Sequence, residues 1–70
     1  MSVTFTIEYE KEEDGRWLAE VLELPGVLAY GRTTEEALAK AQALALRVLA
    51  DRLEHGEGAL ELMSISFAAA

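Results

Sequence analysis

Carboxylate side chains gathered in one short stretch are the first candidates for chemistry in this chain. Five acids lie between residues 8 and 14, namely Glu8, Glu10, Glu12, Glu13 and Asp14. Paired carboxylates on a sheet can hold Mg²⁺ for phosphoryl chemistry, which would fit a metal-dependent nuclease. However, Glu8 and Glu10 fall on the polar face of a predicted strand, and the other three acids fall in a turn. We therefore interpret the stretch as a solvated acidic hairpin and predict no metal site.

Nucleophiles and further metal ligands are scarce. The chain has no Cys, and its serines lie near the two ends without the partners that a catalytic triad needs. His55 is the only histidine, and we expect it at a helix C-terminus, where a cation is mildly favourable. A single His among scattered acids is not a metal-ligand set. We therefore predict that the protein is not an enzyme and uses no cofactor.

Strand-like patterns flank the acidic stretch on both sides. Residues 3–10 alternate strictly between apolar and polar side chains, which predicts a half-buried strand. Its apolar face would carry Val3, Phe5, Ile7 and Tyr9. Asp14-Gly15 is a strong signal for a hairpin turn, because Gly tolerates positive φ. Residues 17–23 then predict the returning strand.

A short strand and a long helix follow. The Leu-Pro-Gly segment at 24–26 suits a type II turn, after which residues 27–31 predict a third strand. Thr33-Thr34-Glu35-Glu36 is a capping-box pattern, in which Thr33 accepts a hydrogen bond from the amide of Glu36. From residue 34 to about residue 54 there is no Gly or Pro. This predicts about six turns of helix.

The order of elements predicts the fold class. Residues 60–67 indicate a fourth strand, and residues 68–70 a frayed end. The order is therefore strand, strand, strand, helix, strand, which predicts an α+β fold. We expect an antiparallel-type sheet of three to four strands with one long helix on one face. The 70 residues form a single domain, 1–70, with 3–67 as its ordered part.

The predicted helix carries more apolar surface than one sheet needs. Its charged residues fall in one narrow stripe, and the apolar arc spans roughly 200°, whereas a helix on a sheet needs about 100°. Loops or another chain would cover the excess, unless its many Ala residues are simply tolerated in water. Leu46 and Leu53 lie well off the centre of the arc and favour another chain. A domain this small is also marginal alone. We therefore predict a homodimer, with a tetramer as the alternative.

Two further apolar features leave alternatives open. Trp17 beside the turn is either a core residue or an interface anchor. Another set of residues would share the sheet face away from the core, and this face is a contact surface if nothing covers it. That set comprises Leu18, Leu22, Leu28 and Tyr30.

Composition narrows the classes of partner. The formal net charge is −7, which opposes nucleic-acid binding through phosphates and suits a basic partner protein. No segment approaches 18 consecutive apolar residues, so we expect no membrane span. Without a recognisable signal peptide, we expect a cytoplasmic location. The absence of Asn and Cys hints at a thermophilic source.

Three sequence motifs, in this order, resemble the HicB antitoxin family. They are Asp14-Gly15-Arg16-Trp17-Leu18-Ala19-Glu20-Val21, then Glu23-Leu24-Pro25-Gly26-Val27, then Gly31-Arg32-Thr33-Thr34-Glu35-Glu36-Ala37. The resemblance covers about residues 3–67, and E-L-P-G followed by G-x-T-x-E-E-A is fairly specific. It implies a partial ribonuclease H-like fold without a working catalytic centre. The C-terminal DNA-binding segment of many family members has no counterpart here, so we expect no DNA binding.

The same resemblance implies a function, which is to bind and block a small basic ribonuclease toxin of the HicA type. An acidic module meeting a basic toxin agrees with the charge argument. The alternative is a stand-alone homo-oligomeric domain of unknown role with no toxin partner. The candidate protein-interface residues are Asp14, Trp17, Leu18, Glu20, Tyr30, Leu46 and Leu53.

Overall fold

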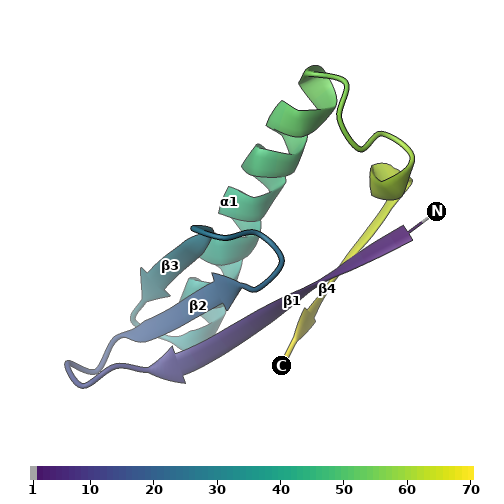
Figure 1. The fold of residues 1–70 in the computed structure, drawn as a ribbon. Helices are drawn as coiled ribbons and strands as arrows, with labels where there is room; N and C mark the ends of the chain where they lie inside the picture. Colours follow the sequence, from purple (N-terminus) through teal and green to yellow (C-terminus); the bar gives the residue numbers. More distant parts are fainter. Residues whose placement is uncertain (1) are drawn as a thin grey trace.

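The computed structural model describes residues 2–70 and has the predicted order of elements. Met1, with which the predicted domain begins, lies outside the described residues. The elements are β1 (Ser2–Lys11), β2 (Trp17–Val21), β3 (Leu28–Gly31), α1 (Thr34–Glu54), the 3₁₀ helix η1 (Glu61–Met63) and β4 (Ser64–Ala69) (Figure 1). The α+β fold with one long helix is confirmed. In this part of the chain, no helix is long and apolar enough to span a membrane.

The sheet is mixed, with strand order β3-β2-β1-β4. β1 pairs with β2, and β2 with β3, in antiparallel fashion, whereas β4 lies parallel to β1. The prediction of an antiparallel-type sheet is therefore wrong for β4. Figure 1 shows the reason: α1 returns the chain to the end at which β1 starts, so β4 must run in the direction of β1. A long crossover of this kind is what parallel pairing needs.

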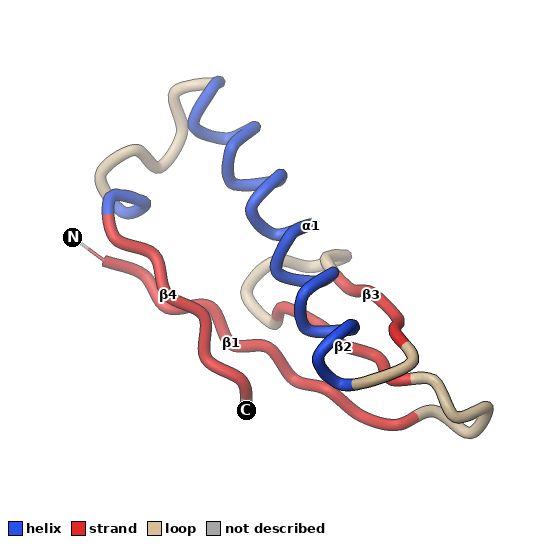
Figure 2. The backbone as a smooth tube through the Cα atoms, turned by 180° about the vertical axis from the view of Figure 1, so that it is seen from behind, coloured by secondary structure: helices blue, strands red, loops and turns tan. Residues whose placement is uncertain are grey.

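β1 joins two halves of the sheet. Its first half, Ser2–Ile7, pairs with β4, and its second half, Ile7–Lys11, pairs with β2. α1 packs over β2 and β3 and diverges from the β1–β4 pair toward its C-terminus, as Figure 2 shows from behind. The β1–β4 pair therefore projects beyond the part of the sheet that the helix covers.

The chain end is more ordered than the sequence predicts. Residues 61–63 form η1 instead of strand, and β4 continues to Ala69. The N–H of Ala70 donates to the C=O of Ile7 at 2.9 Å. The prediction of a frayed end at residues 68–70 is therefore wrong, because backbone pairing with β1 orders these residues.

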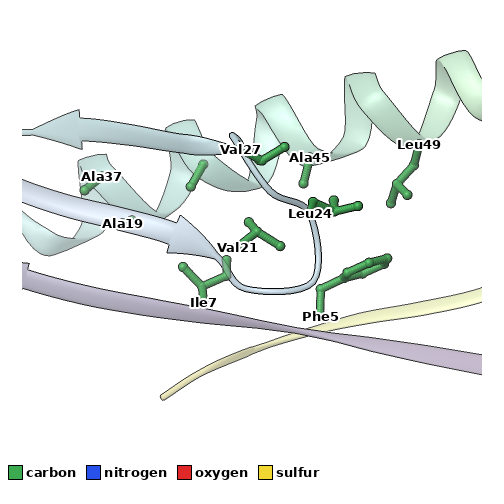
Figure 3. Packing of buried hydrophobic residues seen from close by; sticks show 10 residues of the cluster. Phe5, Ile7, Ala19, Val21, Leu24, Val27, Ala37, Ala45 and Leu49 are labelled. Atoms are coloured by element: carbon green, nitrogen blue, oxygen red, sulfur yellow. The ribbon is translucent and has the colours of Figure 1, made fainter.

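The core lies between α1 and the sheet. Every fourth helix residue from Ala37 to Leu49 is buried, and small alanines let the helix backbone approach the strands closely (Figure 3). The buried hydrophobic residues are Phe5, Ile7, Ala19, Val21, Leu24, Val27, Ala37, Ala41, Ala45 and Leu49. Gly31 also belongs to this close approach, because a Cβ there would lie 2.5 Å from the backbone nitrogen of Ala37.

The capping box forms with one difference from its usual pattern. Thr33 Oγ1 accepts a hydrogen bond from the N–H of Glu36 at 3.1 Å, as predicted. The Glu36 carboxylate reaches back to the N–H of Arg32, one residue before the cap, at 2.9 Å. This hydrogen bond, together with the nearby Lys40 ammonium, holds the pKa of Glu36 below its ordinary value. The helix start is therefore fixed by its own local side chains.

Candidate functional site

Within residues 2–70, no helix or strand packs on one face of the sheet. The helix lies on the opposite face, and side chains alternate along each strand, so every second side chain points away from the helix. Strand register places them in rows, with Glu8 opposite Glu20, and with Leu18 between Glu10 and Tyr30. We call the part of this surface on β2, β3 and the second half of β1 the open face, and it comprises Glu8, Glu10, Leu18, Glu20, Leu28 and Tyr30. It is therefore an apolar strip beside a cluster of acids.

The apolar part of the open face is accessible. Leu28 and Tyr30 on β3 are exposed, and Leu18 on β2 is half-buried between its neighbours. A shallow depression of about 350 Å³ lies along β1 and β2. It is lined by Glu8, Tyr9, Glu10, Leu18, Glu20 and Ala70. Exposed apolar side chains rimmed by polar ones are typical of protein-interaction sites.

Arg16 connects the acidic turn to the edge of the open face. Its Nε lies 2.7 Å from Asp14 Oδ2, and its backbone N–H donates to Asp14 Oδ1 at 3.0 Å. The guanidinium carbon lies 4.3 Å from the centroid of the Tyr30 ring. The backbone hydrogen bond, and then the guanidinium, hold the pKa of Asp14 below its ordinary value. Arg16 is thus held between a carboxylate and an aromatic ring.

The charged side chains that belong to the open face are all acidic, and the Arg16 guanidinium lies over Tyr30 at the edge of this face. The six residues of the open face include three carboxylates, Glu8, Glu10 and Glu20, and no cation. Two of them, Glu8 and Glu20, lie directly opposite each other on neighbouring strands. Like charges in that arrangement repel each other across a sheet. A cation from a binding partner would relieve this repulsion.

The seven predicted interface residues fall on three surfaces. Leu18, Glu20 and Tyr30 come together on the open face, and Asp14 adjoins it through Arg16. Trp17 lies on the helix side of the sheet, half-buried, with its ring centroid 6.2 Å from that of Tyr9. The remaining two, Leu46 and Leu53, are exposed on α1, with 45% and 42% of their surface accessible.

Three contributors to this region have roles that sequence reasoning missed. Glu8 and Glu10 belong to the open face as well as to the acidic hairpin, and their alternation with the core residues of β1 was the available signal. Arg16 is the third, because no other arginine lies near it in the sequence to indicate a basic patch. The Asp-Gly-Arg order of the turn is a signal for its pairing with Asp14, but the contact with Tyr30 depends on the β2–β3 register.

The arrangement supports binding through side-chain contacts. Between residues 2 and 70, no three His, Cys, Asp or Glu side chains are placed to hold a metal ion. His55 ends the helix, with Nδ1 2.7 Å from the C=O of Asp51. Comparison of the chain with models of protein families, with curated proteins and with solved structures finds no match.

Proposed function

We propose that this chain is an antitoxin-type module that binds and blocks a small basic ribonuclease toxin of the HicA type. The observation that carries the proposal is the open face, where exposed apolar side chains lie beside three carboxylates. The resemblance of its motifs to the HicB family supports the same function. The apolar strip supplies contact area, and the carboxylates select a partner rich in Lys and Arg.

Charge and burial contribute differently to such a complex. Apolar contact is the main source of affinity, because it removes Leu18, Leu28 and Tyr30 from water. Carboxylates at the rim mainly accelerate encounter with a cationic protein and reject acidic ones. The net charge of −7 also attracts a positively charged protein over longer distances. Binding should therefore be fast at low salt and slower at high salt.

Charge reversal on the open face tests this proposal. Binding of a purified HicA-type toxin is followed by stopped-flow fluorescence, and inhibition of its ribonuclease activity is measured in parallel. The variant Glu8→Lys/Glu20→Lys should associate at least tenfold more slowly than the unmodified chain at low salt. The matched control Glu54→Lys/Glu57→Lys makes the same change in net charge near the helix C-terminus. It should slow association much less.

Three results would count against the proposal. One is the absence of binding to any HicA-type toxin tested, and another is binding that leaves ribonuclease activity intact. The third is an equal effect of the two double variants, because net charge alone would then explain the rates.

A self-associating domain without a toxin partner is the second candidate. Leu46 and Leu53 are separated by seven positions, so they lie on nearly the same side of α1, and both are exposed. A small domain gains stability when a second copy covers such surface. Sedimentation equilibrium tests this candidate, which predicts a mass above that of the 7.7 kDa chain.

A further inference from the structure

β4 is an edge strand whose outer side has free hydrogen-bonding groups. The N–H of Ala70 bonds to β1, and bonding direction alternates along a strand. Ser64, Ser66 and Ala68 therefore also face β1. By the same alternation, Ile65, Phe67 and Ala69 direct their N–H and C=O groups away from β1, toward the open edge. Nothing in the described residues 2–70 pairs with that edge.

This edge lacks the usual protection against another strand. Ser64–Ala69 contains no charged residue, no Pro and no Gly. Its register with β1 runs without a bulge from Ser2–Ser64 to Ile7–Ala69. Natural proteins commonly blunt edges with charges, Pro or bulges, or keep them very short. β4 has six residues and none of these features.

β3, the strand at the other edge of the sheet, is better protected against pairing than β4. β3 has four residues, and the C=O of Val27 just before it bonds to Val21 on β2. Only Leu28 and Tyr30 then direct backbone groups outward. Arg16 lies over the Tyr30 ring on this side. β3 is therefore the protected edge and β4 the open one.

Apolar exposure is concentrated beside β4. Met63 and Leu60 are the most exposed large hydrophobic side chains between residues 2 and 70, at 80% and 69%. Ile65 and Phe67 on the strand itself are only half-buried. Because β4 is free of charge, two copies of a chain with net charge −7 can approach here without placing carboxylates against each other.

We infer that a second copy of this chain pairs with the outer edge of β4. A two-fold axis makes the two β4 strands antiparallel. With Phe67 opposite Phe67 of the second copy, Ile65 lies opposite Ala69, and all outward N–H and C=O groups are paired. Two four-stranded sheets become one continuous sheet of eight strands.

Side-chain packing favours the same register. The rings of Phe5 and Phe67 contact each other within one copy, with centroids 5.7 Å apart and planes tilted by 31°. Their side chains lie on the helix side of the sheet. Placing the two copies of Phe67 side by side therefore makes a row of four rings across the dimer. Aromatic pairs of this kind add stability beyond the area that they bury.

The inference rests on self-association, the second function proposed above, and identifies its surface. It does not depend on toxin binding. The acids of the open face lie on β2 and the second half of β1, whereas β4 pairs with the first half. A dimer through β4 would therefore leave the three acids of the open face accessible to a basic partner.

Two double variants test the register by charge. In the proposed dimer Ser66 lies opposite Ala68 of the second copy, on the face away from the helix. Ser66→Glu/Ala68→Glu places carboxylates against each other twice, whereas Ser66→Lys/Ala68→Glu makes two opposite-charge pairs. Both lose the same hydrogen bond between Ser66 and Thr4. By sedimentation equilibrium, the first should dimerise at least tenfold more weakly than the unmodified chain, and the second should remain dimeric.

Cysteine cross-linking provides a second measurement if the charged variants fail to fold. The chain has no Cys, so Ser66→Cys/Ala68→Cys introduces the only thiols. Directly opposed residues of this pair type have Cα atoms about 4.5 Å apart, within disulfide range. Mild oxidation should give a covalent dimer of the double variant, whereas either single variant should remain largely uncrosslinked.

The outcomes separate the two proposals. An unmodified chain that remains monomeric at about 100 µM, where mass action favours association, would overturn both β4 pairing and self-association. A dimer that neither charge pattern changes and that cysteines at 66 and 68 do not cross-link would overturn β4 pairing alone. It would leave self-association to another surface, such as the one that carries Leu46 and Leu53.

Discussion

The carboxylate of Glu23 accepts a hydrogen bond from the backbone N–H of Thr6 at 2.8 Å. β2 has already ended at Val21, and the N–H of Leu22 donates to the C=O of Thr6 at 3.0 Å. The Glu23 side chain therefore takes the place of the strand that would otherwise continue along β1. It satisfies a backbone donor at the point where the two halves of the sheet meet.

This hydrogen bond predicts a specific loss of stability in acid. It holds the pKa of Glu23 below its ordinary value of 4.5. A lowered folded-state pKa adds stability above the ordinary value, and this stability is lost as the pH falls below it. Urea unfolding at several pH values should show that Glu23→Gln is less stable than the unmodified chain at pH 7, and that the two converge near pH 3. A stability difference that is equal at both pH values would contradict this role.

The contact between Arg16 and Tyr30 predicts a measurable coupling energy. A cation over an exposed aromatic ring contributes about 0.5–1 kcal/mol. A double-mutant cycle with Arg16→Ala and Tyr30→Leu, measured by chemical unfolding, should give a coupling of this size. Arg16→Lys should retain only part of it, because a guanidinium stacks on a ring and an ammonium does not. Additive effects of the two substitutions would show that the contact contributes nothing to stability.

Any side chain at Gly31 should destabilise the fold. A Cβ at this position would lie 2.5 Å from the backbone nitrogen of Ala37 and 3.0 Å from its Cα. Backbone atoms cannot rotate away as a flexible side chain can, so β3 and α1 would have to separate. Gly31→Ala should cost about 1–3 kcal/mol, the usual range for overpacking, and Gly31→Val should cost more. Thermal unfolding measures both, and a Gly31→Ala protein as stable as the original would contradict the close approach.

Two leucines of α1 provide a matched test of the core. Leu49 is 1% exposed and Leu53 is 42% exposed. Leu49→Ala should cost about 2–5 kcal/mol, because it leaves a cavity between the helix and the sheet. Leu53→Ala should cost less than about 1 kcal/mol in the monomer. A large and concentration-dependent loss for Leu53→Ala would instead show that a second chain covers this residue.

Local signals account for the elements that the sequence predicted correctly. The helix is confirmed over Thr34–Glu54, and its cap is confirmed at Thr33. Capping, alternation and the absence of Gly and Pro all act between residues a few positions apart, so they can be recognised in the sequence itself. The same holds for the apolar alternation of β1, which correctly placed Phe5 and Ile7 in the core.

The direction of β4 and the order of residues 68–70 depend on pairing between residues that are far apart in the sequence. Thr4 and Ser66, which share a hydrogen bond, are 62 positions apart, and no local pattern indicates that β4 runs parallel to β1. The same pairing orders residues 68–70, which the sequence alone predicted to fray.

The candidate site likewise combines features that the sequence predicts with features that depend on tertiary structure. Sequence alternation determined which side chains share a face of each strand. Only the register between strands placed Leu18 beside Tyr30, and Glu8 beside Glu20. The path of the chain through α1 places β4 beside β1, at the outer edge of the sheet. These features depend on how whole elements dock, because backbone pairing and core burial are satisfied only when the entire sheet and helix are assembled.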